Sequence, residues 1–294
     1  MEERTNWGRW TEADQVGTLN LMTPERVIAA TRLVSEGRVL SLGHIIRHDI
    51  PHHPDRPPPM HVLTVDGGDY AAGARRNGGA CVADDYLAMP LATGTHLDGL
   101  AHAWAGDALY NGHSPMGVRS RGAKVCGIEN VYGMVTRGVI ADVAGFLDEQ
   151  WLPPSHCITA EEIAGALGGM EPGPGDALLI RTGWLASENL SARGLRGIQK
   201  AQPGIGLEAV DWIADHDIAL VGSDTFGVEV LPPENPATGM PVHIALLNNL
   251  GVYMMEMLQL DELAASGRRE FLLVVAPLRI RGGINSPVNP LAVL

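Results

Sequence analysis

The sequence predicts an α/β fold in which helices surround a mixed β-sheet. Short apolar runs at 138–143 (GVIADV) and 176–182 (DALLIRT) are typical of buried strands. Helical patterns are interspersed among the strands without a clean βαβ repeat, which favours a mixed sheet. Because no internal repeat or low-complexity linker divides the chain, residues 1–294 are expected to form a single domain.

Three segments carry helix signals. Residues 23–25 (TPE) place a Thr N-cap, a Pro and an acid at a helix start, and the helix is expected to stop at Gly37. Residues 159–162 (TAEE) form a capping box that opens a helix to Leu167. A third helix is expected over 206–215, where apolar residues share one face.

The remaining strands and loops follow from apolar runs and from turn residues. The 36 glycines and 20 prolines predict many tight loops and short elements. Loops are expected at 47–59 and 70–79, of which the first is rich in His and Pro. Extended segments are expected at 39–46, 80–89, 218–222, 252–255 and 271–276.

Charge and composition exclude several classes of function. The net charge of −13 disfavours nucleic acids and anionic membranes as partners, because both bind basic surfaces. No apolar run approaches the roughly 18 residues of a membrane span, and the first residues lack the apolar core of a signal peptide. Three widely spaced cysteines suit a reducing compartment. We therefore expect a cytoplasmic protein that acts on a small-molecule substrate.

The stretch 92–102 (ATGTHLDGLAH) carries the strongest chemical signal. Side chains alternate along an extended segment, so His96 and Asp98 are expected on the same side, where they can close on one metal ion. His102 follows a turn expected at Gly99 and can fold back over the site, where an imidazole is suited to exchange protons with water. The alternative is that His96 and Asp98 only bond to each other, with His102 on the surface.

Residues 94–102 (GTHLDGLAH) resemble the GTHxDxPxH signature of the cyclase-like, metal-dependent hydrolases, which include bacterial kynurenine formamidases and isatin hydrolases. The resemblance extends over most of the chain. It implies the swivelling β/β/α fold of this family and a homo-oligomer, a dimer or tetramer, with the pocket near a subunit interface. The segments that carry it are 9–27, 110–117, 175–184, 221–233 and 282–293.

The resemblance also implies roles for individual residues. His96 and Asp98 correspond to metal ligands and His102 to the catalytic base and acid, while His243 and Glu256 are the candidates for the ligands contributed by the second half of the chain. Glu256 has support of its own, since an unpaired carboxylate is costly to bury in the apolar run 253–258 (YMMEML).

One position departs from the family pattern. Many members carry another ligand His four residues before the position of His96, and this chain has Ala92 there. One zinc or manganese ion could be held by four residues, His96, Asp98, His243 and Glu256. Alternatively His102 or a water could fill the gap, or the site could act by acid–base chemistry without a metal.

Other candidates have two readings each. Trp104, two residues after His102, is a candidate wall for a flat substrate or a core residue. Asp224 and Glu229 are candidates for orienting a ligand His or for capping a loop. No thiol nucleophile is proposed for Cys81, Cys126 or Cys157, and Ser223 lacks the closing Gly of a GxSxG elbow, so a serine nucleophile is not supported either.

Three functional hypotheses remain open. The first is a metal-dependent hydrolase of an amide, cyclic amide or lactone of a small aromatic substrate, with His102 as general base and acid. The second is a cyclase or lyase that moves protons on the same scaffold without net hydrolysis. The third is a non-catalytic binding protein, against which the intact trio His96, Asp98 and His102 speaks.

Overall fold

The computed structural model describes residues 4–53, 55–75, 77–186, 200–235 and 237–294. A nine-stranded sheet runs through the body in the order β1-β15-β13-β7-β9-β11-β12-β4-β14. Its four central strands are parallel to one another, and the strands on both sides run antiparallel to their neighbours. The predicted mixed sheet is confirmed. The central strands are β7 (Met134–Asp142), β9 (Ala177–Arg181), β11 (Leu220–Ser223) and β12 (Tyr253–Glu256).

The flanking strands complete this sheet, and three small sheets lie outside it. One flank holds β13 (Glu270–Val275), β15 (Leu291–Val293) and β1 (Val39–Ser41), and the other holds β4 (His96–Asp98) and β14 (Asn285–Pro287). The small sheets pair β2 (Met60–Val65) with β3 (Asp84–Ala88), β5 (Val118–Arg119) with β6 (Gly122–Ala123), and β8 (Cys157–Ile158) with β10 (Gly204–Ile205).

The helices are short and pack against the body. The α1 helix contacts β7 and β13, α4 contacts β7, and α6 lies beside α7 and the π-helical segment η6. Among the described helices none is long and apolar enough to cross a membrane. The helices are α1 (Pro24–Thr31), α2 (Gly67–Ala71), α3 (Val143–Phe146), α4 (Ala160–Leu167), α6 (Leu207–Asp215), α7 (Pro241–His243), η6 (Ile244–Leu250) and α8 (Asp261–Ala265). Single 3-10 turns occupy Gly17–Leu21, Asn77–Gly79, Tyr110–Gly112, Pro115–Gly117 and Ile128–Asn130.

Most predicted elements are present, with shifted ends. The capping box of α4 forms as expected, with both Thr159 and Glu162 bonding to backbone N–H groups. The first helix ends at Thr31 and not at Gly37, and the strand expected over 39–46 covers only Val39–Ser41. The main-chain bond that follows β1, from Leu42 N–H to Pro290 O, joins it to the C-terminal segment beside β15, a long-range pairing that local sequence does not encode.

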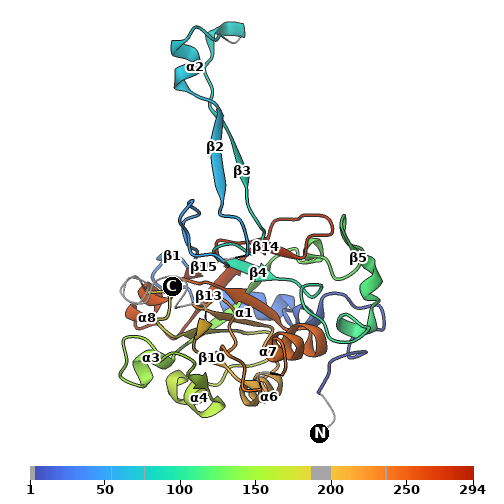
Figure 1. Cartoon of the computed structure of the whole chain (residues 1–294). Helices are drawn as coiled ribbons and strands as arrows, with labels where there is room; N and C mark the ends of the chain where they lie inside the picture. Colours follow the sequence, from blue (N-terminus) through green and yellow to red (C-terminus); the bar gives the residue numbers. More distant parts are fainter. Residues whose placement is uncertain (1–3, 54, 76, 187–199, 236) are drawn as a thin grey trace.

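The strands β2 and β3 form an arm that stands away from the body, with α2 at its tip (Figure 1). The extended segment expected at 80–89 is therefore confirmed as β3, but β2 was not predicted, and the loop expected at 70–79 contains the end of α2 and a 3-10 turn. Every side chain of β2 except Val65 is exposed. The arm has no core of its own.

Candidate metal centre and active site

Neighbouring strands bring the predicted donors together at one flank of the main sheet. In the antiparallel register of β4 and β12, His96 stands opposite Glu256. His96 and Asp98 point to the same side of β4, as their spacing predicts, while Leu97 between them belongs to the hydrophobic core. The predicted metal ligands His96, Asp98 and Glu256 therefore lie close together, because β4 is extended and pairs with β12.

A glycine sets the path of the chain into β4. Gly94 has φ of +65°, and a Cβ there would lie 2.7 Å from Ile50 Cδ1, so a larger residue would be both strained and crowded. The Gly94 carbonyl accepts a hydrogen bond from His96 Nδ1 over 2.7 Å. This bond fixes the tautomer of His96 and turns its Nε2 towards the other donors.

His243 is fixed in the same way by a carboxylate. Its Nδ1 donates to Glu229 Oε1, and the other oxygen of Glu229 accepts the Val242 N–H at the start of α7 over 3.1 Å. Both His243 and Glu229 are buried. Of the two roles considered for Glu229, its bond to His243 matches the orientation of a candidate ligand His.

The donor atoms of the four predicted ligands, which are His96, Asp98, His243 and Glu256, lie at separations that suit a divalent ion. His96 Nε2 is 3.6 Å from Asp98 Oδ1 and 3.2 Å from Glu256 Oε2, while His243 Nε2 is 3.1 Å from Glu256 Oε1 and 4.0 Å from Asp98 Oδ2. Ligands at tetrahedral angles on bonds of roughly 2.1 Å are about 3.4 Å apart. Two groups of three described residues each bring one donor atom per residue within 4.8 Å of the others: His96, Asp98 and Glu256 form one group, and Asp98, His102 and His243 form the other. The separations therefore suit a divalent ion, and Asp98 is common to both groups.

Hydrogen bonding within the cluster is incomplete without a cation. Both carboxylate oxygens of Asp98 are buried and accept no hydrogen bond from the described residues. Since Nδ1 of each His donates to oxygen, a neutral ring presents a lone pair at Nε2 to the oxygens of Glu256. The Nε2 and carboxylate oxygen atoms of each pair are 3.1–3.2 Å apart, and their lone pairs repel each other unless a proton or a metal ion lies between them.

The pKa values of the cluster residues describe the alternative in which protons take the place of a metal ion. Burial lowers the pKa of His96, but the bond to Glu256 and its charge outweigh burial and raise that pKa to about 8. For His243, Glu229 and Glu256 outweigh burial and raise the pKa to about 10. Burial raises the pKa of Glu256, but the two imidazoles hold that pKa well below its usual range. Burial raises the pKa of Asp98, and the nearby His102 opposes the shift.

His102 lies beside the cluster and faces solvent. Its N–H closes the predicted turn with the Gly99 carbonyl, and its Nε2 is 3.9 Å from Asp98 Oδ2. Its Nδ1 accepts the side-chain N–H of Asn285 over 3.2 Å, and Asn285 stands opposite Asp98 in the register of β14 and β4. Because Asn285 Oδ1 has no partner among the described residues, a rotated amide can accept from Nδ1–H and leave Nε2 basic. His102 is thus placed to accept and return a proton.

A cavity of about 640 Å³ opens onto the cluster and exposes His102 to a ligand. Its apolar wall includes Phe226, Met240 and Met257, and the titratable side chains of His53, Asp55, Arg56 and Lys200 also line it. Ala92, at the position of the family's additional His, also lines the cavity. Trp104 is 38% exposed and lies outside the set of residues that line this cavity, so its predicted contact with substrate stays a prediction.

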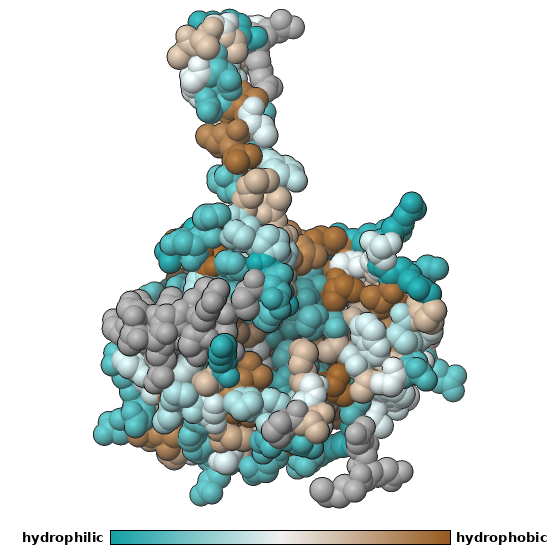
Figure 2. Space-filling model, viewed as in Figure 1, coloured by the Kyte–Doolittle hydropathy of each residue, from teal (hydrophilic) through white to brown (hydrophobic). Residues whose placement is uncertain are grey.

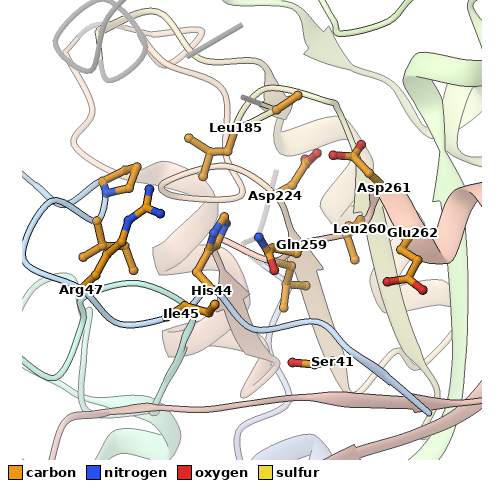
Figure 3. Close-up of a pocket in the computed structure, with 14 residues that line it drawn as sticks. Ser41, His44, Ile45, Arg47, Leu185, Asp224, Gln259, Leu260, Asp261 and Glu262 are labelled. Carbon is orange, nitrogen blue, oxygen red and sulfur yellow. The ribbon is translucent and has the colours of Figure 1, made fainter. Parts of the chain in front are cut away.

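Asp224 lines a separate cavity of about 480 Å³ (Figure 3). Its Oδ1 accepts the N–H of Thr182 at 2.9 Å and its hydroxyl at 2.6 Å, and its Oδ2 accepts the Gly183 N–H at 2.7 Å. Burial raises the pKa of Asp224 to about 6 against these bonds. Asp224 therefore caps the loop after β9, the second of the two roles considered for it.

Comparison with known proteins identifies the family. Residues 40–230 match the family model "Putative cyclase". The chain belongs to the cyclase family. A solved structure described as a novel cyclase is 39% identical, with a TM-score of 0.91 over 99% of this chain and 100% of the other. No curated protein matches the sequence.

Two more distant structures share the fold. Isatin hydrolase A from Labrenzia aggregata, bound to benzyl benzoate, is 22% identical, with a TM-score of 0.63 over 91% of this chain and 97% of its own. A "predicted metal-dependent hydrolase" from Bacillus stearothermophilus is 18% identical, with a TM-score of 0.54 over 87% of this chain and 97% of its own. The fold expected from the motif is confirmed.

Sequence reasoning missed two residues at the site, Asn285 and Arg56. Asn285 reaches His102 only because β14 pairs with β4, across 183 residues of sequence. Arg56 comes from the loop at 47–59, where the structure of a Pro-rich segment depends on distant contacts. The acceptor of its hydrogen bond, the Ala92 carbonyl, is a backbone atom that no side-chain pattern reveals.

Proposed function

We propose that this protein is a metal-dependent hydrolase that holds one zinc or manganese ion on His96, Asp98, His243 and Glu256. The observation that carries the proposal is the pair of buried Asp98 oxygens without hydrogen-bond partners, set among imidazole nitrogens whose tautomers are fixed by Gly94 and Glu229. A buried carboxylate is costly unless a cation balances it. Nitrogen and carboxylate donors in this number suit zinc or manganese.

The reaction proposed is hydrolysis of an amide, a cyclic amide or a lactone. A bound divalent ion would supply water of lowered pKa and polarise the carbonyl group. His102 accepts the proton of that water at Nε2 and returns it to the leaving nitrogen or oxygen. With its amide rotated, Asn285 accepts from Nδ1–H in both protonation states of His102, so that the proton is gained and lost at Nε2.

The cavity supports a small aromatic substrate. Phe226, Met240 and Met257 offer an apolar wall beside polar groups, and the volume of about 640 Å³ is in the range of ligand sites. Structural relatives named isatin hydrolase act on an aromatic cyclic amide, as their name states. Trp104 remains a candidate wall for such a ring.

The alternative is a cyclase or lyase on the same scaffold. Protons on His96 and His243 can balance Glu256 in place of a metal ion, as the raised pKa values of both rings indicate. His102 would then move protons without activated water. The description of the 39% identical relative as a cyclase keeps this reaction class open.

We further propose a homo-oligomer, a dimer or tetramer, held in part by the arm. A two-stranded ribbon is marginally stable in water, yet β2 and β3 carry exposed apolar side chains on both faces. Figure 2 shows apolar residues along the arm. Tyr86 is 53% exposed and Leu63 is 54% exposed. A second copy of the chain would bury them. The free thiols of Cys81, Cys126 and Cys157 support a cytoplasmic location.

The test is a hydrolysis assay on a panel of aryl amides, lactams and aryl lactones. We expect turnover of at least one member by protein loaded with zinc or manganese, and loss of turnover after dialysis against a chelator with recovery on adding metal. Turnover that survives chelation, or product formed without uptake of water, would instead support the cyclase or lyase.

A further inference from the structure

We propose that a basic cavity beside the active site binds an anionic oxygen group of the substrate, a carboxylate or a phosphate. The cavity has a volume of about 460 Å³, and three arginines, Arg56, Arg121 and Arg281, line it. Neither Asp nor Glu is among the described residues that line it. Its other lining residues are Pro90, Leu91, Ala92, Ile280, Gly282, Gly283, Ile284 and Asn285.

None of the described carboxylates neutralises the three guanidinium groups. Within the described part of the chain, no carboxylate oxygen lies within 4.0 Å of the guanidinium of Arg56, Arg121 or Arg281, although other arginines form such pairs. The chain has 34 acidic residues against 21 basic ones, so three unpaired cations in one cavity run against its overall charge. Such a cluster concentrates anions from solution.

Arg56 is held in place at the edge shared with the active site. It is half-buried, and its Nη1 donates to the carbonyl of Ala92, which leaves the rest of the guanidinium for a ligand. The loop on the opposite wall is also held, because the Gly282 N–H donates to Glu129 Oε1 over 2.7 Å. The cavity is therefore built from anchored walls, although Arg121 and Arg281 themselves are exposed.

The basic cavity adjoins the proposed catalytic site and shares two lining residues with it. Arg56 and Ala92 line both the basic cavity and the cavity that contains His96 and His102. Asn285 also lines the basic cavity, and its side-chain N–H is bonded to His102 Nδ1. One molecule can therefore place its reacting carbonyl at His102 and its anionic group among the arginines.

The chemistry of the cavity specifies the ligand group. Guanidinium presents a planar fork of N–H donors that matches carboxylate and phosphate oxygens. Three such groups favour a ligand that carries two negative charges or two carboxylates. That the anion belongs to the substrate rests on the proposed function, whereas anion binding by the cavity does not.

The test separates these two statements. The first measurement is calorimetric titration of the metal-loaded full-length protein with benzene-1,3-disulfonate, a dianion that coordinates metals weakly, at low ionic strength. Arg121→Gln and Arg281→Gln should each weaken binding about tenfold, the loss of one charge-assisted bond. Arg32→Gln is the matched control, because Arg32 is exposed and its loss changes the net charge equally. His96→Ala should bind the dianion as the unaltered protein does.

Unchanged binding in both arginine variants, an equal loss in Arg32→Gln, or loss only in His96→Ala would overturn the anion site. The second measurement compares an aryl amide with its carboxylated analogue as substrates. Arg281→Gln should raise KM about tenfold for the carboxylated amide alone. Equal effects on both amides would overturn the assignment to substrate, and no hydrolysis of either with dianion binding intact would contradict the proposed function and leave the anion site supported.

Discussion

In most proteins charged side chains are exposed and apolar side chains are buried. The donor cluster on β4 and β12 buries charged groups, whereas the arm of β2 and β3 exposes apolar groups. In the cluster, charged groups are buried: Asp98 and Glu256 lie on strands in which every residue is buried. In the arm, apolar groups are exposed, and strand pairing gives them no covering layer (Figures 1 and 2).

The two regions differ in what would complete them. The cluster needs a small cation, because the unpaired oxygens of Asp98 are buried beside imidazole nitrogens. The arm needs an extended apolar surface, because its exposed residues are spread along a ribbon. A buried charge and an exposed apolar surface therefore each indicate the size and chemistry of the partner that would stabilise them.

The largest expected effect is on turnover through His102. His102→Gln should lower kcat by about 10²–10⁴-fold, because a positioned acid–base group contributes that much. Its metal content should not change if His96, Asp98, His243 and Glu256 are the ligands. Elemental analysis of the purified variant checks this, and loss of metal would make His102 a ligand, as its position 3.9 Å from Asp98 permits.

The next effect is on metal affinity through Glu229. Glu229→Gln should weaken affinity by about 10–100-fold, because the charge that orients His243 and raises its basicity is lost. Glu234→Gln is the matched control, since Glu234 accepts the Leu207 N–H and has no contact with the cluster. Competition titration with a chelating dye measures both variants, and equal affinities for the two would contradict the role of Glu229.

How much of this site the sequence could predict depends on the range of the contacts. His96 and Asp98 follow from alternation along one strand, and Glu256 follows from a charge inside an apolar run. His243 was expected by resemblance, and its orientation needs Glu229 on another loop. Asn285 and Arg56 could not be predicted, because they act through pairing of β14 with β4 and through a backbone carbonyl. Of the arm, β3 was predicted as part of the extended segment at 80–89, whereas β2 was missed because it lacks the polar–apolar alternation of half-buried strands.

A third effect is on the pH dependence of metal binding. Metal must displace a proton from His96, with a pKa of about 8, and from His243, with a pKa of about 10. Affinity should therefore fall by about a hundredfold per pH unit below pH 8 and by about tenfold per unit between pH 8 and 10. The same dye titration from pH 6 to 9.5 checks the slope, and a flat profile would contradict proton–metal competition.

The smallest effect on the metal centre is expected from the arm. The double variant Val62→Ser, Tyr86→Ser removes a cross-strand apolar pair and should shift the oligomer towards monomer without changing metal content. Ile28→Ser, at an exposed apolar position on α1, is the control. Analytical ultracentrifugation measures the change, and an unaltered sedimentation profile in the double variant would remove the arm from the interface.

The central claim is that the buried cluster holds one divalent ion. Elemental analysis of protein purified without chelator, beside the His96→Ala variant, tests it most directly. The account predicts about one zinc or manganese per chain in the unaltered protein and a loss of that metal in the variant. Absence of metal from both proteins, with the fold intact, would contradict the account and leave proton transfer by His102 as the chemistry of the site.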